Sequence, residues 1–203
     1  MKKLPDTLCA SLALLALVAS ALAPTSLFAT DIAWTGAADD GGNVLTGTNW
    51  DGDAAPGASD RAQIGDAPEA VLSGSWAPQY LDIGTTAGKT GTLTVGSGGE
   101  LSVTTVNNGT GVTAGSVRMG AAAGAAAVLN IDGGTMTVHS LNTPNYAATS
   151  TVNMASGTLN ITGWMDWGRN ANGLSTFNQS GGTVNMGGNL WIGRDNNGTA
   201  IYN

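Results

Sequence analysis

A short strand pattern recurs in this 203-residue chain beyond residue 90, and this repetition constrains the fold more than any other feature. Each copy has four residues with an apolar side chain at its second position. The copies are TLTV (Thr92–Val95), VLNI (Val128–Ile131), TVNM (Thr151–Met154), TFNQ (Thr176–Gln179) and AIYN (Ala200–Asn203). Their apolar anchors, residues 93, 129, 152, 177 and 201, are 36, 23, 25 and 24 residues apart. The period is therefore about 24 residues, with one enlarged first repeat.

Two further strands accompany these copies. After a glycine turn, a second strand follows in GSGGELSV, DGGTMTV, ASGTLNI and SGGTVNM. A third strand precedes most copies as LDIG, VRMG, MDWG and LWIG, but the stretch LNTPNYAA contains Pro144 and shows no clear copy. Short alternating strands between Gly-rich turns predict an all-β fold, namely a right-handed parallel β-helix with three short strands per coil of about 24 residues. We expect about five coils over residues 81–203.

Alternation along each strand predicts which side chains fill the interior. Three inner columns are expected, formed by Leu93, Leu129, Val152 and Phe177, by Leu101, Met136, Leu159 and Val184, and by Ile83, Met119, Trp167 and Ile192. A fourth column of Val95, Ile131 and Met154 is interrupted by Gln179. Outside, Asn130, Asn153 and Asn178 are expected to stack and to hydrogen-bond along the axis, beside a column of Thr135, Thr158 and Thr183.

The first 29 residues have the pattern of an export signal. Lys2 and Lys3 precede an apolar run from Leu8 to Ala23 that is short and Ala-rich for a membrane span. We expect cleavage after Ala29, with cleavage after Ala23 or an uncleaved anchor as alternatives. The expected organisation is a signal peptide at 1–29, an N-terminal cap or first irregular coil at 30–80, and β-helix repeats at 81–203.

The chain expected after cleavage is acidic and contains no cysteine. Cys9 lies within the signal, so neither disulfides nor thiol chemistry is expected. The whole chain has a formal net charge of −7, and loss of Lys2, Lys3 and Asp6 leaves 5 basic and 13 acidic residues. This balance disfavours nucleic acid and anionic membrane surfaces as partners.

The strand Ala200–Asn203 has no turn and no second strand after it. A β-helix that stops there exposes an apolar layer and unpaired backbone, which natural repeat proteins cap. We therefore expect the chain to be the N-terminal part of a longer protein, with a C-terminus that caps itself or dimerises as the alternative. End-to-end self-association is a related expectation.

The segment WTG…NWDGDAAPGASDRAQIG, followed by GTLTVGSGGELSV, LNIDGGTMTV and FNQSGGTVNMGGNLWIGR, resembles large exported β-helical proteins of bacteria. These include autotransporter passenger-type repeat proteins and similar surface proteins with a C-terminal sorting segment. The resemblance covers about residues 31–203 and rests on low-complexity repeats. It implies a cell-surface or extracellular location, with an outer-membrane anchor in the full-length protein.

Several polar residues are candidates for binding or catalysis. Six acids precede the repeats, at Asp39, Asp40, Asp51, Asp53, Asp60 and Asp66. Carboxylates bind Ca²⁺, but the spacing matches neither an EF-hand nor a calcium β-roll, so turn-forming Asp is favoured over a metal site. Trp34 and Trp50 are expected to plug the N-terminal end. His139, the only histidine, is expected at the surface, and no cofactor is predicted.

A small ligand-contact patch is the remaining candidate. Asp82, Arg118, Asp166 and Trp191 occupy the equivalent outward position in copies of one strand. Asp166, Arg169, Trp191 and Arg194 are therefore candidates for saccharide contact, with the Trp as a stacking face. Arg169 and Arg194 recur at one repeat position, in WGRN and IGRD, so a structural role at a turn is favoured.

The sequence contains no recognisable set of catalytic residues, so a non-catalytic role is expected. We predict an exported structural or adhesive surface protein, a stalk whose partner is a surface polysaccharide or a host or matrix protein. The alternative is a carbohydrate-active β-helix that binds or cleaves polysaccharide. Such an enzyme needs a non-repeating cluster of acids and bases on one face.

Overall fold

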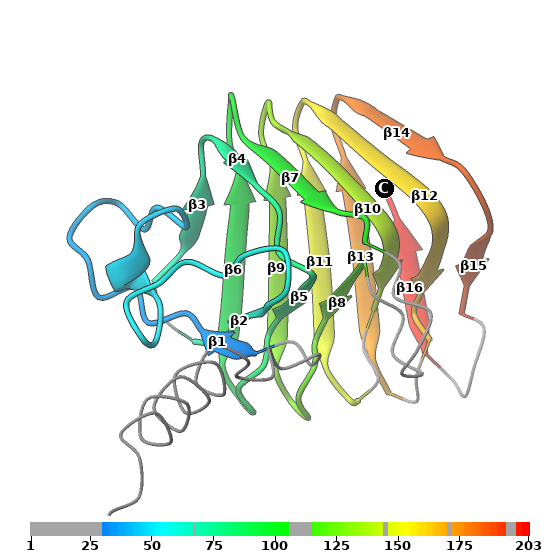
Figure 1. The fold of residues 1–203 in the computed structure, drawn as a ribbon. Coiled ribbons are helices and arrows are strands. Elements are labelled where there is room, and N and C mark those ends of the chain that lie inside the picture. The colour runs from blue at the N-terminus through cyan, green and yellow to red at the C-terminus, as the bar shows by residue number, and fades with distance from the viewer. Residues whose placement is uncertain (1–29, 67, 106–114, 144–145, 170–171, 194–197) are drawn as a thin grey trace, which may run out of the picture.

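The computed structural model describes residues 30–203 except 67, 106–114, 144–145, 170–171 and 194–197. These residues form an all-β fold whose named strands pair in parallel, as predicted. Strands follow one another from β1 at one end of the molecule to β15 and β16 at the other (Figure 1). No helix in the described part of the chain is long and apolar enough to cross a membrane. The predicted signal peptide at 1–29 lies outside the described residues.

The first strand of each repeat belongs to a six-stranded sheet. In chain order its members are β3 (Ala70–Leu72), β6 (Thr90–Val95), β9 (Ala126–Ile131), β11 (Thr149–Met154), β13 (Leu174–Gln179) and β16 (Thr199–Tyr202). Leu93 pairs with Leu129, Leu129 with Val152, and Val152 with Phe177. Equivalent residues of the repeat therefore lie side by side, which confirms this predicted column.

The second and third strands of the repeats share a ten-stranded sheet. The second strands are β4 (Ser75–Trp76), β7 (Glu100–Val103), the first halves of β10 (Thr135–Asn142) and β12 (Thr158–Trp167), and β14 (Thr183–Met186). The third strands are β1 (Asp31–Ala33), β2 (Arg61–Ile64), β5 (Tyr80–Ile83), β8 (Ser116–Met119), the second halves of β10 and β12, and β15 (Leu190–Ile192). A register shift between Val138 and Ser140 marks the bend within β10.

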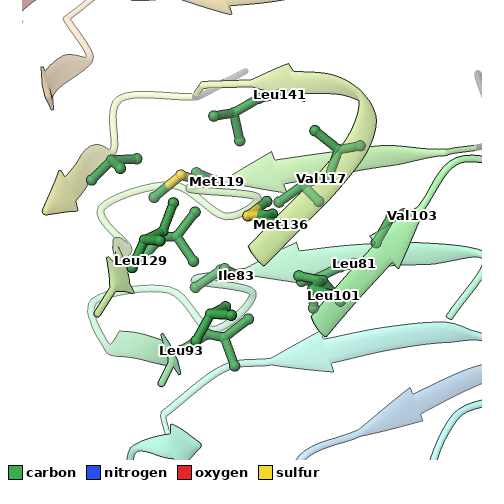
Figure 2. Packing of buried hydrophobic residues seen from close by; sticks show 14 of the residues in the cluster. Leu81, Ile83, Leu93, Leu101, Val103, Val117, Met119, Leu129, Met136 and Leu141 are labelled. Atoms are coloured by element: carbon green, nitrogen blue, oxygen red, sulfur yellow. The ribbon is translucent and has the colours of Figure 1, made fainter. Parts of the chain in front are cut away.

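The interior is filled by the side chains that strand alternation predicts. Leu101 and Met136 pair in register, as do Ile83 and Met119, and each is at most 2% exposed. Figure 2 shows these side chains converging on one interior together with Leu93. Burial of each such side chain contributes roughly 1.5–3 kcal/mol, so these columns supply the main stabilising term of the fold.

The last strand differs from the prediction by one residue. Tyr202 pairs with Phe177, and Ile201 pairs with Thr176. The alignment of the repeats that placed Ile201 at the position of Phe177 was therefore off by one residue, and Tyr202 continues the inner column. Because side chains alternate along a strand, a slip of one residue exchanges inner and outer positions.

The third strand that the sequence did not show around LNTPNYAA is present as the second half of β10. Ser140, Leu141 and Asn142 pair with Ser116, Val117 and Arg118, and on the other side with β12. Thr143 then takes the next inward position, where its hydroxyl donates to the Asp166 carbonyl at 3.0 Å and accepts the Gly168 amide at 2.6 Å. The irregular sequence is compatible with the repeat because these hydrogen bonds satisfy a buried polar side chain.

Paired strands begin well before residue 81. β1 to β4 lie within the segment predicted to be a cap or an irregular coil, and they pair with one another or with β5, β6 and β7. The rings of Trp34 and Trp50 lie 5.0 Å apart, and Trp50 lies 5.5 Å from Trp76. All three are at most 5% exposed. This indole cluster closes one end of the core.

Gly84 shows why a glycine follows the third strand. Its φ of +75° is a conformation that only glycine adopts without strain. A Cβ atom at this position would lie 2.8 Å from the Ala126 carbonyl oxygen of the neighbouring repeat. The turn after β5 therefore needs glycine both for its backbone conformation and for its close approach to β9.

Candidate functional site

Three of the four residues of the predicted patch lie near one another. Asp166 on β12 pairs in register with Trp191 on β15. Arg169 Nε lies 3.5 Å from Asp166 Oδ2, and the Asp166 side chain is only 1% exposed. Arg194 lies outside the described residues. The Asp166 carboxylate is therefore held by local contacts beneath the surface, where it is poorly placed to meet a large ligand.

The outward column that contains this patch carries a network of ion pairs. Arg118 Nε donates to Asp82 Oδ1 at 2.7 Å, and Arg118 Nη2 donates to Asp82 Oδ2. Arg61 Nε lies 3.2 Å from Asp82 Oδ2 and Arg61 Nη1 lies 3.5 Å from Asp31 Oδ1. Asn142, which the sequence reading missed, occupies the next position between Arg118 and Asp166.

Asp82 is the centre of this network. Asp82 is only 2% exposed, and its carboxylate faces the guanidinium groups of Arg61 and Arg118. These two positive charges compensate the buried negative charge. Hydrogen bonding to Asp82 raises the pKa of Arg118 above its ordinary value, against the opposing effect of burial. The network thus joins three successive strands of the sheet, β2, β5 and β8, and serves to position them.

A second arrangement, a ladder of side-chain hydrogen bonds, crosses the six-stranded sheet. Asn203 donates to Asn178, Asn178 to Asn153, and Asn153 to Asn130, at 2.8 to 3.0 Å between Nδ2 and Oδ1. This confirms the predicted Asn column. Asn203, which was not among the residues predicted for this column, extends the ladder by one step.

The ladder ends at a carboxylate. Asn130 Nδ2 donates to Thr94 Oγ1 at 2.9 Å, and Thr94 Oγ1 donates to Glu69 Oε1. Because an ionised carboxylate only accepts hydrogen bonds, Glu69 fixes the direction in which every donor of the ladder points. A shorter ladder with the same direction crosses the ten-stranded sheet, where Asn185 donates to Asn160 and Asn160 to Thr137.

His139 is half-buried rather than simply exposed, because it lies at the bend of β10. Its ring meets the Trp164 ring edge to face, with centroids 4.9 Å apart and planes 81° apart. Its Nδ1 lies 3.5 Å from Thr162 Oγ1. A Cβ atom on Gly163 would lie 2.8 Å from Nε2, so the glycine makes room for the imidazole. These contacts give His139 a packing role.

Among the acids before the repeats, Asp40 and Asp60 accept hydrogen bonds within turns, and Asp66 pairs with Lys89 at 3.5 Å. Asp40 Oδ1 accepts from the Gly42 and Asn43 amides and from Asn49 Nδ2, at 2.9 to 3.2 Å. Hydrogen bonds from the Thr46 and Asn49 side chains, the first of them the stronger, lower the pKa of Asp40. Among the described residues, no three His, Cys, Asp or Glu side chains are grouped so that they could hold a metal ion.

A shallow groove of about 490 Å³ lies over β4, β7 and β10. Its polar lining includes Ser75, Glu100, Ser102, Thr104, Thr135 and Thr137. The Ser75 hydroxyl donates to Glu100 Oε2 at 3.0 Å. Of these residues the sequence predicted only Thr135, as a member of the outward Thr column. Glu100 and Ser102 occupy the equivalent positions of the preceding repeat, where they pair with Thr135 and Thr137. Among the described residues that line the groove, Glu100 is the only carboxylate, whereas a glycosidase ordinarily needs two.

Comparison of the chain with protein-family models, with curated proteins and with solved structures finds no match.

Proposed function

We propose that this chain is a right-handed parallel β-helix which a bacterium exports, and that it acts as a non-catalytic structural or adhesive element of the cell surface. The observation that carries the proposal is the hydrogen-bond ladder from Asn203 to Glu69. It crosses four strands in register, β13, β11, β9 and β6, and its two end residues lie directly after β16 and directly before β3. A ladder of this kind ties each repeat to the next. Such a ladder favours a rigid structural element that presents a fixed surface to a partner.

The chemistry of the outward side chains supports a role without catalysis. Asp82 is neutralised by arginines, and Asp166 is 1% exposed and paired with Arg169. A general acid or base must reach a substrate proton at hydrogen-bond distance. Neither carboxylate is exposed enough to do so, whereas the Asn and Thr columns offer a regular polar face for a polysaccharide or a protein.

Export is the second part of the proposal, and it rests on the basic and apolar pattern of residues 1–29. The test is to express the full chain in a bacterium and to determine the mass and N-terminal sequence of the secreted or surface-exposed product. We expect a product that begins at Thr30. Retention of an uncleaved chain inside the cell would contradict export.

The function itself is tested by offering the purified protein to a panel of bacterial and plant polysaccharides and to matrix proteins. Retention on one of them is measured in parallel with release of new reducing ends or unsaturated sugars. We expect retention without any product. Release of product would favour the enzyme, and no retention on any member of a broad panel would leave only the structural role.

A second candidate function is binding of a sugar chain in the groove over β4, β7 and β10. Its support is the series of hydroxyl groups beside Glu100, since hydroxyl and carboxylate groups are good partners for sugar hydroxyls. This candidate predicts that Glu100→Gln weakens retention at least ten-fold. Asp132→Asn, a change of the same kind at an exposed acid outside the groove, should not weaken it.

A further inference from the structure

Glu100 differs from the other carboxylates on the described strands in having no cationic partner. The other strand carboxylates pair with arginine, namely Asp31 with Arg61, Asp82 with Arg61 and Arg118, and Asp166 with Arg169. No arginine, lysine or histidine among the described residues pairs with Glu100, whose Oε2 accepts from the Ser75 hydroxyl at 3.0 Å. The Glu100 side chain is exposed, so its negative charge is open to a ligand.

This charge lies in the middle of the groove over β4, β7 and β10, because β7 pairs with β4 on one side and with β10 on the other. The described residues that line the groove include no lysine, arginine or histidine. A carboxylate without a compensating cation attracts a positively charged ligand and disfavours an anionic one. The groove volume of about 490 Å³ lies within the range of small-ligand sites.

Hydroxyl groups surround the carboxylate at regular intervals. Thr135 on β10 pairs in register with Glu100, and the next outward pair along these strands is Thr137 with Ser102. Thr137 Oγ1 accepts from Asn160 Nδ2 at 3.2 Å, so its own hydroxyl hydrogen can be donated to a ligand in the groove. These groups match a ligand that carries hydroxyl groups along its length.

A cationic peptide fits these features less well. Glu100 and Thr135 lie where their strands are paired on both sides, so a peptide cannot reach them by adding to a strand edge. Neighbouring strands lie about 4.7–4.9 Å apart, which is close to the length of one pyranose unit in an extended chain. A sugar chain that crosses the three strands therefore places its middle unit over β7.

We propose that the groove binds an extended chain of amino sugars, in which the protonated amine of the middle unit contacts the carboxylate of Glu100. The inference rests on the second candidate function, binding of a sugar chain in this groove, and adds the charge of that sugar. The hydroxyls of Ser102, Thr135 and Thr137 then bind the hydroxyl groups of the same unit and of its neighbour over β10.

The test compares two probes that differ in charge alone at the relevant group. One is a glucosamine trimer, whose amines are protonated at mildly acidic pH, and the other is its neutral N-acetylated counterpart. Titration calorimetry gives Kd for the purified protein, and far-UV circular dichroism checks that each variant is folded. We expect the glucosamine trimer to bind at least about three-fold more tightly, as for a partly exposed ion pair. Glu100→Gln should abolish this preference, whereas Asp132→Asn, at an exposed acid outside the groove, should keep it.

Thr135→Val gives a second readout, because it removes one hydroxyl and keeps the shape of the side chain. It should weaken both trimers by a similar factor, whereas Thr183→Val, in the same column but outside the groove, should weaken neither. Equal affinity of the unchanged protein for the two trimers, or a preference that persists in Glu100→Gln, would overturn the inference and leave sugar binding in place. Binding of neither trimer would remove the sugar candidate as well. Trilysine that binds as tightly as the glucosamine trimer, with no effect of Thr135→Val, would replace the sugar by a cationic peptide.

Discussion

The ring of Tyr202 lies flat on the ring of Phe177, with centroids 5.0 Å apart and planes only 10° from parallel. The Tyr202 hydroxyl donates to Gln179 Oε1, which gives the polar residue of the inner column a partner. This pair of contacts fixes the register of β16 on β13.

Tyr202→Ala removes the ring stack and the hydrogen bond to Gln179. We expect a loss of stability of about 1–2 kcal/mol, because an aromatic pair contributes roughly 0.5–1.5 kcal/mol beyond its buried area. Ile201→Ala is the matched control, since Ile201 pairs with Thr176 and has no ring partner. Urea unfolding at low protein concentration measures both. A larger loss for Ile201→Ala than for Tyr202→Ala would show that the register described for β16 is wrong.

The Asn ladder predicts a difference between its middle and its end. Asn153→Ala removes the acceptor of Asn178 and the donor to Asn130, whereas Asn203→Ala removes one hydrogen bond at the exposed edge. With about 1 kcal/mol per hydrogen bond, we expect Asn153→Ala to cost about 2 kcal/mol and Asn203→Ala less than half of that. Equal losses in urea unfolding would mean that the amides do not act as a connected ladder.

The registers of the inner columns were predictable, because each repeat carries an apolar residue of similar size at the same position. Leu93, Leu129 and Val152 are an example, and their alignment needed only the strand period of two and the repeat of about 24 residues. The repeat also placed Asp82 and Arg118 in one column. Their bidentate contact was not predictable, because it depends on the side-chain conformation of Arg118 and on the burial of Asp82.

The errors arose where the local sequence fits two registers. AIYN has apolar or aromatic side chains at both Ile201 and Tyr202, so alternation alone does not choose between them. The ring of Phe177 makes the choice, since only Tyr202 stacks on it. The third strand at Ser140–Asn142 was not predicted, because it follows Val138 without a glycine turn. The groove beside Glu100 was not predicted because the equivalent outward positions hold Glu100 and Ser102 in one repeat and Thr135 and Thr137 in the next, so no residue type recurs there.

The Asp82 network predicts a strong effect of removing one buried charge. Asp82→Ala leaves Arg118 and Arg61 without their shared carboxylate, so we expect a loss of about 3–5 kcal/mol. Glu100→Ala, at an exposed acid with a single hydroxyl partner, should cost less than about 1 kcal/mol. Adding Arg118→Met to Asp82→Ala should recover part of the loss. Failure of the double variant to recover stability would argue against an uncompensated charge as the cause.

A comparison of alanine substitutions at Gly84 and Gly88 distinguishes the cost of backbone strain from the cost of steric contact. Both have positive φ, +75° and +70°, but a Cβ atom on Gly84 meets Ala126 whereas one on Gly88 meets nothing within 4 Å. Gly88→Ala should therefore cost only the backbone term, about 1–2 kcal/mol. Gly84→Ala should cost at least about 1 kcal/mol more, because β9 must move away. Thermal unfolding of the two variants decides this, and equal losses would remove the steric argument.

The lowered pKa of Asp40 predicts a dependence of stability on pH. Hydrogen bonds from Thr46, Asn49 and two backbone amides favour the carboxylate in the folded chain. A carboxyl group whose pKa is lower when folded than when unfolded, where it is about 3.9, stabilises the fold above that value. This contribution is lost as the pH falls through the folded pKa, which lies below the unfolded one.

Asp40→Asn should therefore reduce the free energy of unfolding at neutral pH, and the difference from the unchanged chain should shrink as the pH falls below about 4. Asp39→Asn alters the net charge by the same amount and leaves the hydrogen bonds of Asp40 in place. Subtracting its effect isolates those bonds from the general repulsion of an acidic chain. Urea unfolding between neutral pH and about pH 2.5 gives the measurement. A difference between the two variants that stays constant over this range would show that the Asp40 bonds do not favour its ionised form, because only a pKa that changes on folding makes stability depend on pH.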